Sequence, residues 1–190
     1  MILYRYENAG AEKKNPKQKY KTKRSPGNVP YVVDNLWEWK RPEGYPNRRH
    51  SVCASPSPEL AKESAPDKEQ LFRVEPKGHV LLVQIEVKDA KFHDDCKNLK
   101  KNLLELLGKG WVGKSIVEKN PIAALWAPCL SEKDVKELFS KEPLAAIRNK
   151  IWNSITFWDN ARVFNPGDPF PFEKGEIFFE ADEWCLYPVE

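Results

Sequence analysis

The sequence is poor in the residues that build metal sites and disulfide frameworks. Its three histidines are scattered, and its four cysteines are widely spaced and form no CxxC pair. These cysteines are Cys53, Cys96, Cys129 and Cys185. Zinc sites and disulfide scaffolds are usually marked by cysteines or histidines at short, regular spacings. We therefore expect no metal ion and no disulfide framework.

Long apolar runs are also missing. No stretch approaches the roughly 18–20 apolar residues that a membrane-spanning helix needs. The chain passes from Met1 straight into Ile2-Leu3-Tyr4-Arg5, without the apolar segment of a signal peptide. There is no internal repeat. These absences predict a cytoplasmic protein that has no membrane partner.

The residues that are present are typical of a globular protein. The chain has 190 residues, of which 41% are hydrophobic and 31% are charged. This is enough to bury a core, and we expect a single catalytic domain over residues 1–190. The 16 prolines predict many loops. The net charge of +3 does not by itself indicate a polyanionic partner.

The positive charge is concentrated in one segment. Residues from about 7 to 30 are polar and lysine-rich, which predicts a flexible loop. Such loops attract phosphate backbones through counterion release, although a solvated loop without function explains the same composition. The candidates for binding an RNA or DNA acceptor are Lys19, Lys21, Lys23, Arg24, Arg48 and Arg49.

The apolar and capping patterns predict an α+β fold with short strands and irregular connections. Strands are expected at residues 1–6, 51–55, 71–74, 79–87, 176–180 and 183–189, and helices at 31–40, 94–107, 131–140 and 143–152. Ser57 fits the N-cap of a further helix, and the segment from Ser131 to Asp134 fits a capping box. A tight turn at Ala181-Asp182 predicts a terminal hairpin.

Three polar residues stand at the ends or edges of apolar strands. Arg5 follows Ile2 and Leu3, and a guanidinium binds phosphate or carboxylate groups in a bidentate manner. Ser55 lies where the second strand ends, and Glu176 enters the last apolar segment, where partial desolvation suits a reactive carboxylate. Each has a structural alternative: a surface arginine, a strand-to-helix turn and a solvent-facing edge glutamate.

Together these segments resemble the mono-ADP-ribosyltransferases of the Arg-Ser-Glu type. The matching pieces, in chain order, are Leu3-Tyr4-Arg5, Val52-Cys53-Ala54-Ser55-Pro56-Ser57 and Gly175-Glu176-Ile177-Phe178-Phe179. Pro56 replaces the middle residue of the family's Ser-Thr-Ser. Lys174 stands where the family often carries Glu or Gln for protein acceptors. These departures argue against protein arginine as the acceptor, and RNA or DNA is the alternative.

The resemblance implies split mixed and antiparallel sheets with peripheral helices around an NAD cleft. Arg5 would contact the pyrophosphate, Ser55 with Ser57 would help to hold NAD, and Glu176 would bind the ribose 2′-hydroxyl and stabilise the oxocarbenium-like state. Tyr31, Trp37 or Trp39 would stack on a ring of NAD, with core packing as the structural alternative. The implied role is a toxin, defence or phage-type effector, with an antitoxin as a potential partner.

A competing motif occupies Gly108 to Ser115, which fits the phosphate-binding pattern G-x-x-x-x-G-K-S. That pattern needs a strand before it and a long helix after it. Here a helix is expected before it, and Pro121 follows too soon for a long helix. A P-loop nucleotide-binding protein that uses Lys114 is therefore one alternative, and a non-catalytic nucleic-acid-binding module is another.

Overall fold

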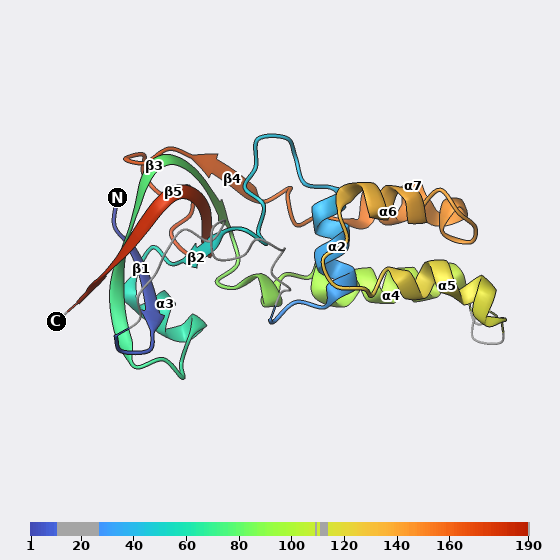
Figure 1. Ribbon diagram of the computed structural model, residues 1–190, viewed down its shortest axis with the longest axis horizontal. Coiled ribbons are helices and arrows are strands. Elements are labelled where there is room, and N and C mark those ends of the chain that lie inside the picture. The colour runs from blue at the N-terminus through green and yellow to red at the C-terminus, as the bar shows by residue number, and fades with distance from the viewer. Residues whose placement is uncertain (11–26, 109, 111–113, 190) are drawn as a thin grey trace. The chain divides into compact units, whose positions relative to one another are not determined.

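The computed structural model describes residues 1–10, 27–108, 110 and 114–189. Within these residues it is an α+β protein with six α-helices and a five-stranded antiparallel sheet that curls into a half-barrel (Figure 1). The expected α+β class is confirmed. One antiparallel sheet stands where the resemblance implied split sheets.

The chain forms two compact units, each built from separate segments. Among the described residues, the sheet unit comprises 1–10, 43–92 and 160–189, and the helical unit comprises 27–42, 93–108, 110 and 114–159. The strands of the sheet unit are β1 (Leu3–Glu7), β2 (Val52–Ala54), β3 (Gln70–Ile85), β4 (Ala161–Phe164) and β5 (Ile177–Pro188). The same unit holds α3 (Pro58–Ser64) and the 3₁₀ helix η1 (Ala90–Phe92).

The sheet curls far enough for its outer strands to meet. The strand order is β1-β3-β5-β2, and β4 pairs with the far end of β3. Tyr4 of β1 and Ser55, just after β2, then form an antiparallel bridge through two backbone hydrogen bonds of 2.9 and 2.8 Å. The segments that carry Arg5, Ser55 and Glu176 are therefore neighbours within one unit.

One long strand, β5, replaces the hairpin expected at the C-terminal end. β5 runs from Ile177 to Pro188 without a turn and pairs with β3. A bulge at Gly78 and His79 of β3 lies opposite Asp182, whose carboxylate accepts the His79 N–H at 2.7 Å. The turn expected at Ala181-Asp182 is therefore wrong, because Asp182 stabilises a bulge in the partner strand instead. The two strands expected at 71–74 and 79–87 are likewise one strand.

The core of the sheet unit lies inside the curl. It consists of Leu3, Val52, Ala54, Val74, Leu82, Phe164, Ile177, Phe179, Ala181 and Trp184. In several strands these residues alternate with others that face away, as the two-residue period of a strand requires. Burial of this inner face is what closes the sheet around itself.

The described residues of the helical unit form five α-helices. They are α2 (Tyr31–Trp39), α4 (Asp95–Leu107), α5 (Ile116–Ala124), α6 (Glu132–Leu138) and α7 (Leu144–Ser154). Contacts join α2 to α4 and α6, and α4 to α7. In the described part of the chain, no helix is both long and apolar enough to span a membrane.

Local capping chemistry places several helix starts as expected. The Ser57 hydroxyl accepts the Leu60 N–H at 3.3 Å, and Ser131 forms the expected capping box with Asp134. Gly108 caps the end of α4 with a φ of 73°. β4 was not expected from the sequence.

Two buried polar side chains fix the helical unit. Asn35 of α2 donates to the carbonyls of Leu125 and Ala127 and accepts the Leu130 N–H, which ties α2 to the segment between α5 and α6. Asp95 is 2% exposed and accepts hydrogen bonds from Trp37 Nε1, the Thr156 hydroxyl and amide, and the Phe157 amide. These side chains are internal connectors of the unit, since buried polar atoms need such partners.

Candidate functional site

Glu176 is held in place by three hydrogen bonds. Its amide donates to the Val87 carbonyl at 2.8 Å, and its carbonyl accepts the Ile85 amide at 3.0 Å. Its carboxylate oxygen Oε2 accepts the Ala90 amide of η1 at 2.9 Å. The other oxygen, Oε1, forms no hydrogen bond within the described residues. A half-buried carboxylate is thus oriented by the backbone with one oxygen left for another partner.

Gly175 makes this position of Glu176 feasible. Its φ is +141°, and a Cβ at residue 175 would lie 1.9 Å from the Ile85 carbonyl oxygen. Any side chain would force the segment before β5 away from the end of β3. The chain therefore brings Glu176 against β3 only because residue 175 is glycine.

Arg5 is already partly engaged. Its Nε donates to Glu7 Oε1 at 2.7 Å, and its Nη1 donates to the Cys53 carbonyl at 2.6 Å. The Arg5 side chain is 27% exposed, and that of Glu7 is 9% exposed. These contacts use two of the five N–H groups of the guanidinium. Arg5 therefore braces β2 two residues before Ser55 and keeps donors for an anion.

Ser55 sits where β1, β2 and the start of β5 come together. It is 5% exposed, and its hydroxyl forms no hydrogen bond in the part of the chain that the structure describes. Ala54 pairs with Ile177. Ser55 follows Ala54 and Glu176 precedes Ile177, so each adjoins the last residue pair of this register. Ser57, in contrast, caps α3, as the structural alternative proposed.

The three residues do not all start from the same face of the sheet. Leu3, Ala54 and Ile177 belong to the core inside the curl. Strand alternation therefore directs Ser55 and Glu176 outward, while Arg5 starts from the inner face. Ser55 and Glu176 thus start from one face of the sheet and Arg5 from the other.

The aromatic candidates lie in the helical unit. Trp37 is 1% exposed, stacks on Phe157 with ring centroids 3.9 Å apart and donates to Asp95. Trp39 is also buried and stacks on Phe139 at 4.6 Å. Core packing therefore accounts for both tryptophans. Tyr31, at the start of α2, is 39% exposed.

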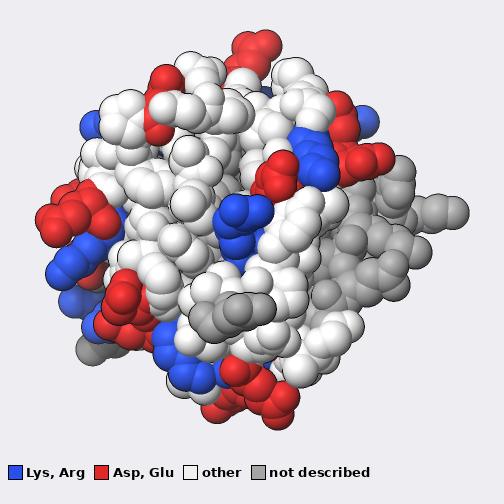
Figure 2. Space-filling view, turned by 90° about the vertical axis from the view of Figure 1, so that its left-hand side faces the viewer, with Lys and Arg blue, Asp and Glu red and all other residues white. Residues whose placement is uncertain are grey.

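The acceptor candidates divide into two groups. Lys19, Lys21, Lys23 and Arg24 lie outside the described residues. Arg49 is 2% exposed and so does not present its side chain to solvent. The Arg48 guanidinium carbon lies 5.9 Å from the ring centroid of Phe178. On the face shown in Figure 2, positive and negative side chains are interspersed around a broad uncharged area.

Comparisons complete the description of the site. No protein-family model, no curated protein and no solved structure matches the chain. Function therefore has to be argued from the residues of the site and their chemistry.

The P-loop pattern lies in a different context from the one the motif requires. It follows helix α4 rather than a strand, and residues 109 and 111–113 are outside the described residues. Pro121 was expected to follow too soon for a long helix, and the helix found there, α5, has nine residues and includes Pro121. Ser115 and Glu118 form a capping box there, and Lys114 pairs with Glu118 at 3.2 Å. Without a preceding strand, the phosphate-binding interpretation loses its main support.

Two other features of the described residues bear on ligands. No group of three or more metal-ligating side chains gathers among them. A hollow of about 380 Å³ in the sheet unit lies between Met1, Ile2 and residues 73–76 of β3. It does not include Arg5, Ser55 or Glu176.

The contribution of η1 to the position of Glu176 has no signal in the sequence. The Ala90 amide orients Glu176, yet any residue except proline supplies an amide, so no residue type could signal it. Phe92 and the lysines around it were also not singled out. The contacts of Val87 and Ala90 with Glu176 depend on the close approach of the segments after β3 and before β5, which are far apart in the sequence.

Proposed function

We propose that this chain is an NAD-dependent ADP-ribosyltransferase that modifies a macromolecular acceptor. One observation carries the proposal: the Glu176 carboxylate is fixed by the Ala90 amide at 2.9 Å, and its second oxygen forms no hydrogen bond within the described residues. Rigid placement of a carboxylate is what electrostatic stabilisation of a cationic transition state requires. The implied role is a toxin, defence or phage-type effector.

The reaction begins with cleavage of the bond between C1′ of the nicotinamide ribose and the nicotinamide nitrogen. The electron pair of that bond leaves with nicotinamide, and positive charge develops on the ribose. Glu176 Oε1 stabilises this charge or binds the ribose 2′-hydroxyl. The acceptor nucleophile then bonds to C1′ and releases a proton.

Ser55 and Arg5 have supporting roles in this proposal. The Ser55 hydroxyl, which has no hydrogen bond among the described residues, orients the ribose or the Glu176 carboxylate. Arg5 keeps β2 in place through the Cys53 carbonyl, 2.6 Å from its Nη1. Its remaining N–H groups are suited to the pyrophosphate, since charge-assisted bonds to phosphate are among the strongest available.

The test is transfer of label from NAD labelled in its adenylate moiety to cell extract and to added nucleic acid. Glu176→Gln should reduce transfer at least about 100-fold, because the amide cannot supply the negative charge. Its side-chain oxygen can still accept the Ala90 amide, so the fold should survive.

The matched control is Glu173→Gln, which changes an exposed carboxylate three residues earlier. It should transfer label like the wild type. Full transfer by Glu176→Gln would refute the proposal, as would an equal loss in both variants.

A further inference from the structure

An exposed aromatic ring flanked by two lysines lies two residues from the amide that binds Glu176. Phe92, the last residue of η1, is 56% exposed. The ammonium nitrogens of Lys88 and Lys91 lie 5.3 and 5.0 Å from the centroid of its ring. Both distances are within the range of a cation–π interaction. A single exposed aromatic residue does not by itself indicate a binding site, so the argument for a site here depends on the residues around Phe92.

The ring is tied to the proposed catalytic carboxylate through η1. Ala90, two residues before Phe92, donates its amide to Glu176 at 2.9 Å. Two residues span at most about 7 Å between their Cα atoms. A molecule stacked on Phe92 therefore lies within reach of a reaction at Glu176.

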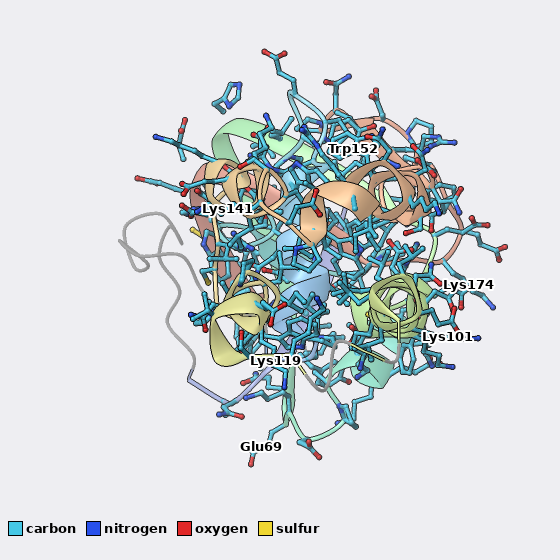
Figure 3. The ribbon with its side chains drawn as sticks, turned by 90° about the vertical axis from the view of Figure 1, so that its right-hand side faces the viewer. Glu69, Lys101, Lys119, Lys141, Trp152 and Lys174 are labelled. Atoms are coloured by element: carbon cyan, nitrogen blue, oxygen red, sulfur yellow. The ribbon has the colours of Figure 1, made fainter. Side chains whose placement is uncertain are left out.

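Each of the two lysines beside the ring forms an ion pair with a carboxylate. Lys88 pairs with Glu63 at 2.8 Å, and Lys91 pairs with Asp89 at 3.2 Å. Lys88 holds the pKa of the Glu63 carboxyl below its ordinary value. Lys174 lies two residues before Glu176 in the chain. The Lys174 side chain extends into solvent (Figure 3). The Lys88–Glu63 pair is solvent-exposed, and such pairs contribute little stability, so a phosphate group can replace Glu63 as the partner of Lys88. Asp89 is only 7% exposed and stays paired with Lys91, whose ammonium group has further N–H donors for a phosphate.

We propose that Phe92, Lys88, Lys91 and Lys174 form a stacking platform that binds single-stranded nucleic acid as the acceptor. A base stacks on the Phe92 ring, and the lysines bind the flanking phosphates. Aromatic rings combined with cations are the usual means of binding single strands without base-specific readout. The inference rests on the proposed function, because it names the acceptor class for the same site.

The test is fluorescence anisotropy with a labelled single-stranded oligonucleotide of mixed sequence, in RNA and DNA forms at one fixed salt concentration. Phe92→Ala should weaken binding about tenfold, since one stacked base contributes about 1–3 kcal/mol. Phe92→Trp should restore it. Lys91→Ser should lower the slope of log affinity against log salt by about one.

Tyr187 offers a matched control. It is a 37% exposed aromatic of the same unit, with the Arg73 guanidinium carbon 5.1 Å from its ring centroid. It lies near the far end of β5 from Glu176. Tyr187→Ala should bind the oligonucleotide like the wild type.

The outcomes separate this inference from the proposed function. Binding that is unchanged in Phe92→Ala, or weakened equally in Tyr187→Ala, overturns the platform. Label transfer to protein alone, with loss in Phe92→Ala, also overturns it and indicates a protein acceptor. Binding that depends on Phe92 without any Glu176-dependent labelling supports the platform and refutes the enzyme.

Discussion

Asp95→Ala should lower the free energy of unfolding of the helical unit more than the substitution of a nearby exposed aspartate by alanine. Asp95→Ala leaves the Trp37 indole N–H and the amides of Thr156 and Phe157 without their acceptor. Each buried donor left unsatisfied costs about 1–3 kcal/mol. Three such donors sum to about 3–9 kcal/mol, and entry of water favours the lower part of that range. We expect about 4 kcal/mol, a large share of the 5–15 kcal/mol typical of a protein.

Asp95→Asn should cost less, about 1–2 kcal/mol. Its remaining oxygen can accept the Trp37 and Phe157 donors that share Oδ2 in the wild type. The Thr156 hydroxyl, 2.7 Å from Oδ1, can turn and accept from the new amide.

The assay is urea unfolding followed by tryptophan fluorescence, because Trp37 stacks on Phe157. Asp94→Ala is the matched control, since Asp94 is exposed and its side chain forms no capping hydrogen bond at the start of α4. It should change stability by less than about 0.5 kcal/mol. Equal costs for the Asp94 and Asp95 alanine variants would refute the reasoning.

Two further predictions concern stability. Gly175→Ala should destabilise the sheet unit strongly in thermal unfolding, because the new Cβ would lie 1.9 Å from the Ile85 carbonyl oxygen. Gly167→Ala is the control: its φ is +101° and no atom lies within 4 Å of the Cβ position, so it should cost only backbone strain. Similar losses of stability in the two variants would contradict this. Burial lowers the pKa of His93 against the opposing effect of Asp95, Asp94 and Asp159. The unfolded chain therefore takes up the proton first, and stability should fall as the pH drops below the ordinary value of 6.5. His93→Gln should flatten that dependence in urea titrations at several pH values, and an unchanged slope would contradict it.

The parts of the fold that follow from neighbouring residues could be predicted from the sequence. Ser57 and Ser131 cap helices because the hydroxyl reaches an amide three residues away. The apolar spacing of α2 and α4 is equally local. In contrast, Asp182 looked like a turn residue, and only its pairing with the bulge at Gly78 and His79 shows otherwise.

The candidate site could be predicted only in part for the same reason. The types and order of Arg5, Ser55 and Glu176 indicated three neighbouring strands, and the sheet topology brings those segments together. The face from which each side chain starts depends on strand register, which one residue reverses. The hydrogen bond from the Ala90 amide to Glu176 could not be predicted, because nearly every residue type has a backbone amide.

The pairing of β3 with β5 affects how the newly made chain matures. β5 is the last of the described strands, and the helical segment 93–159 is synthesised between the two partners. At translation rates of roughly 5–20 residues per second, β5 is synthesised on the order of ten seconds after β3. During that interval its unpaired backbone groups can be captured by another nascent chain. Polysomes, where such chains are crowded together, are therefore where this protein is most exposed to misassembly.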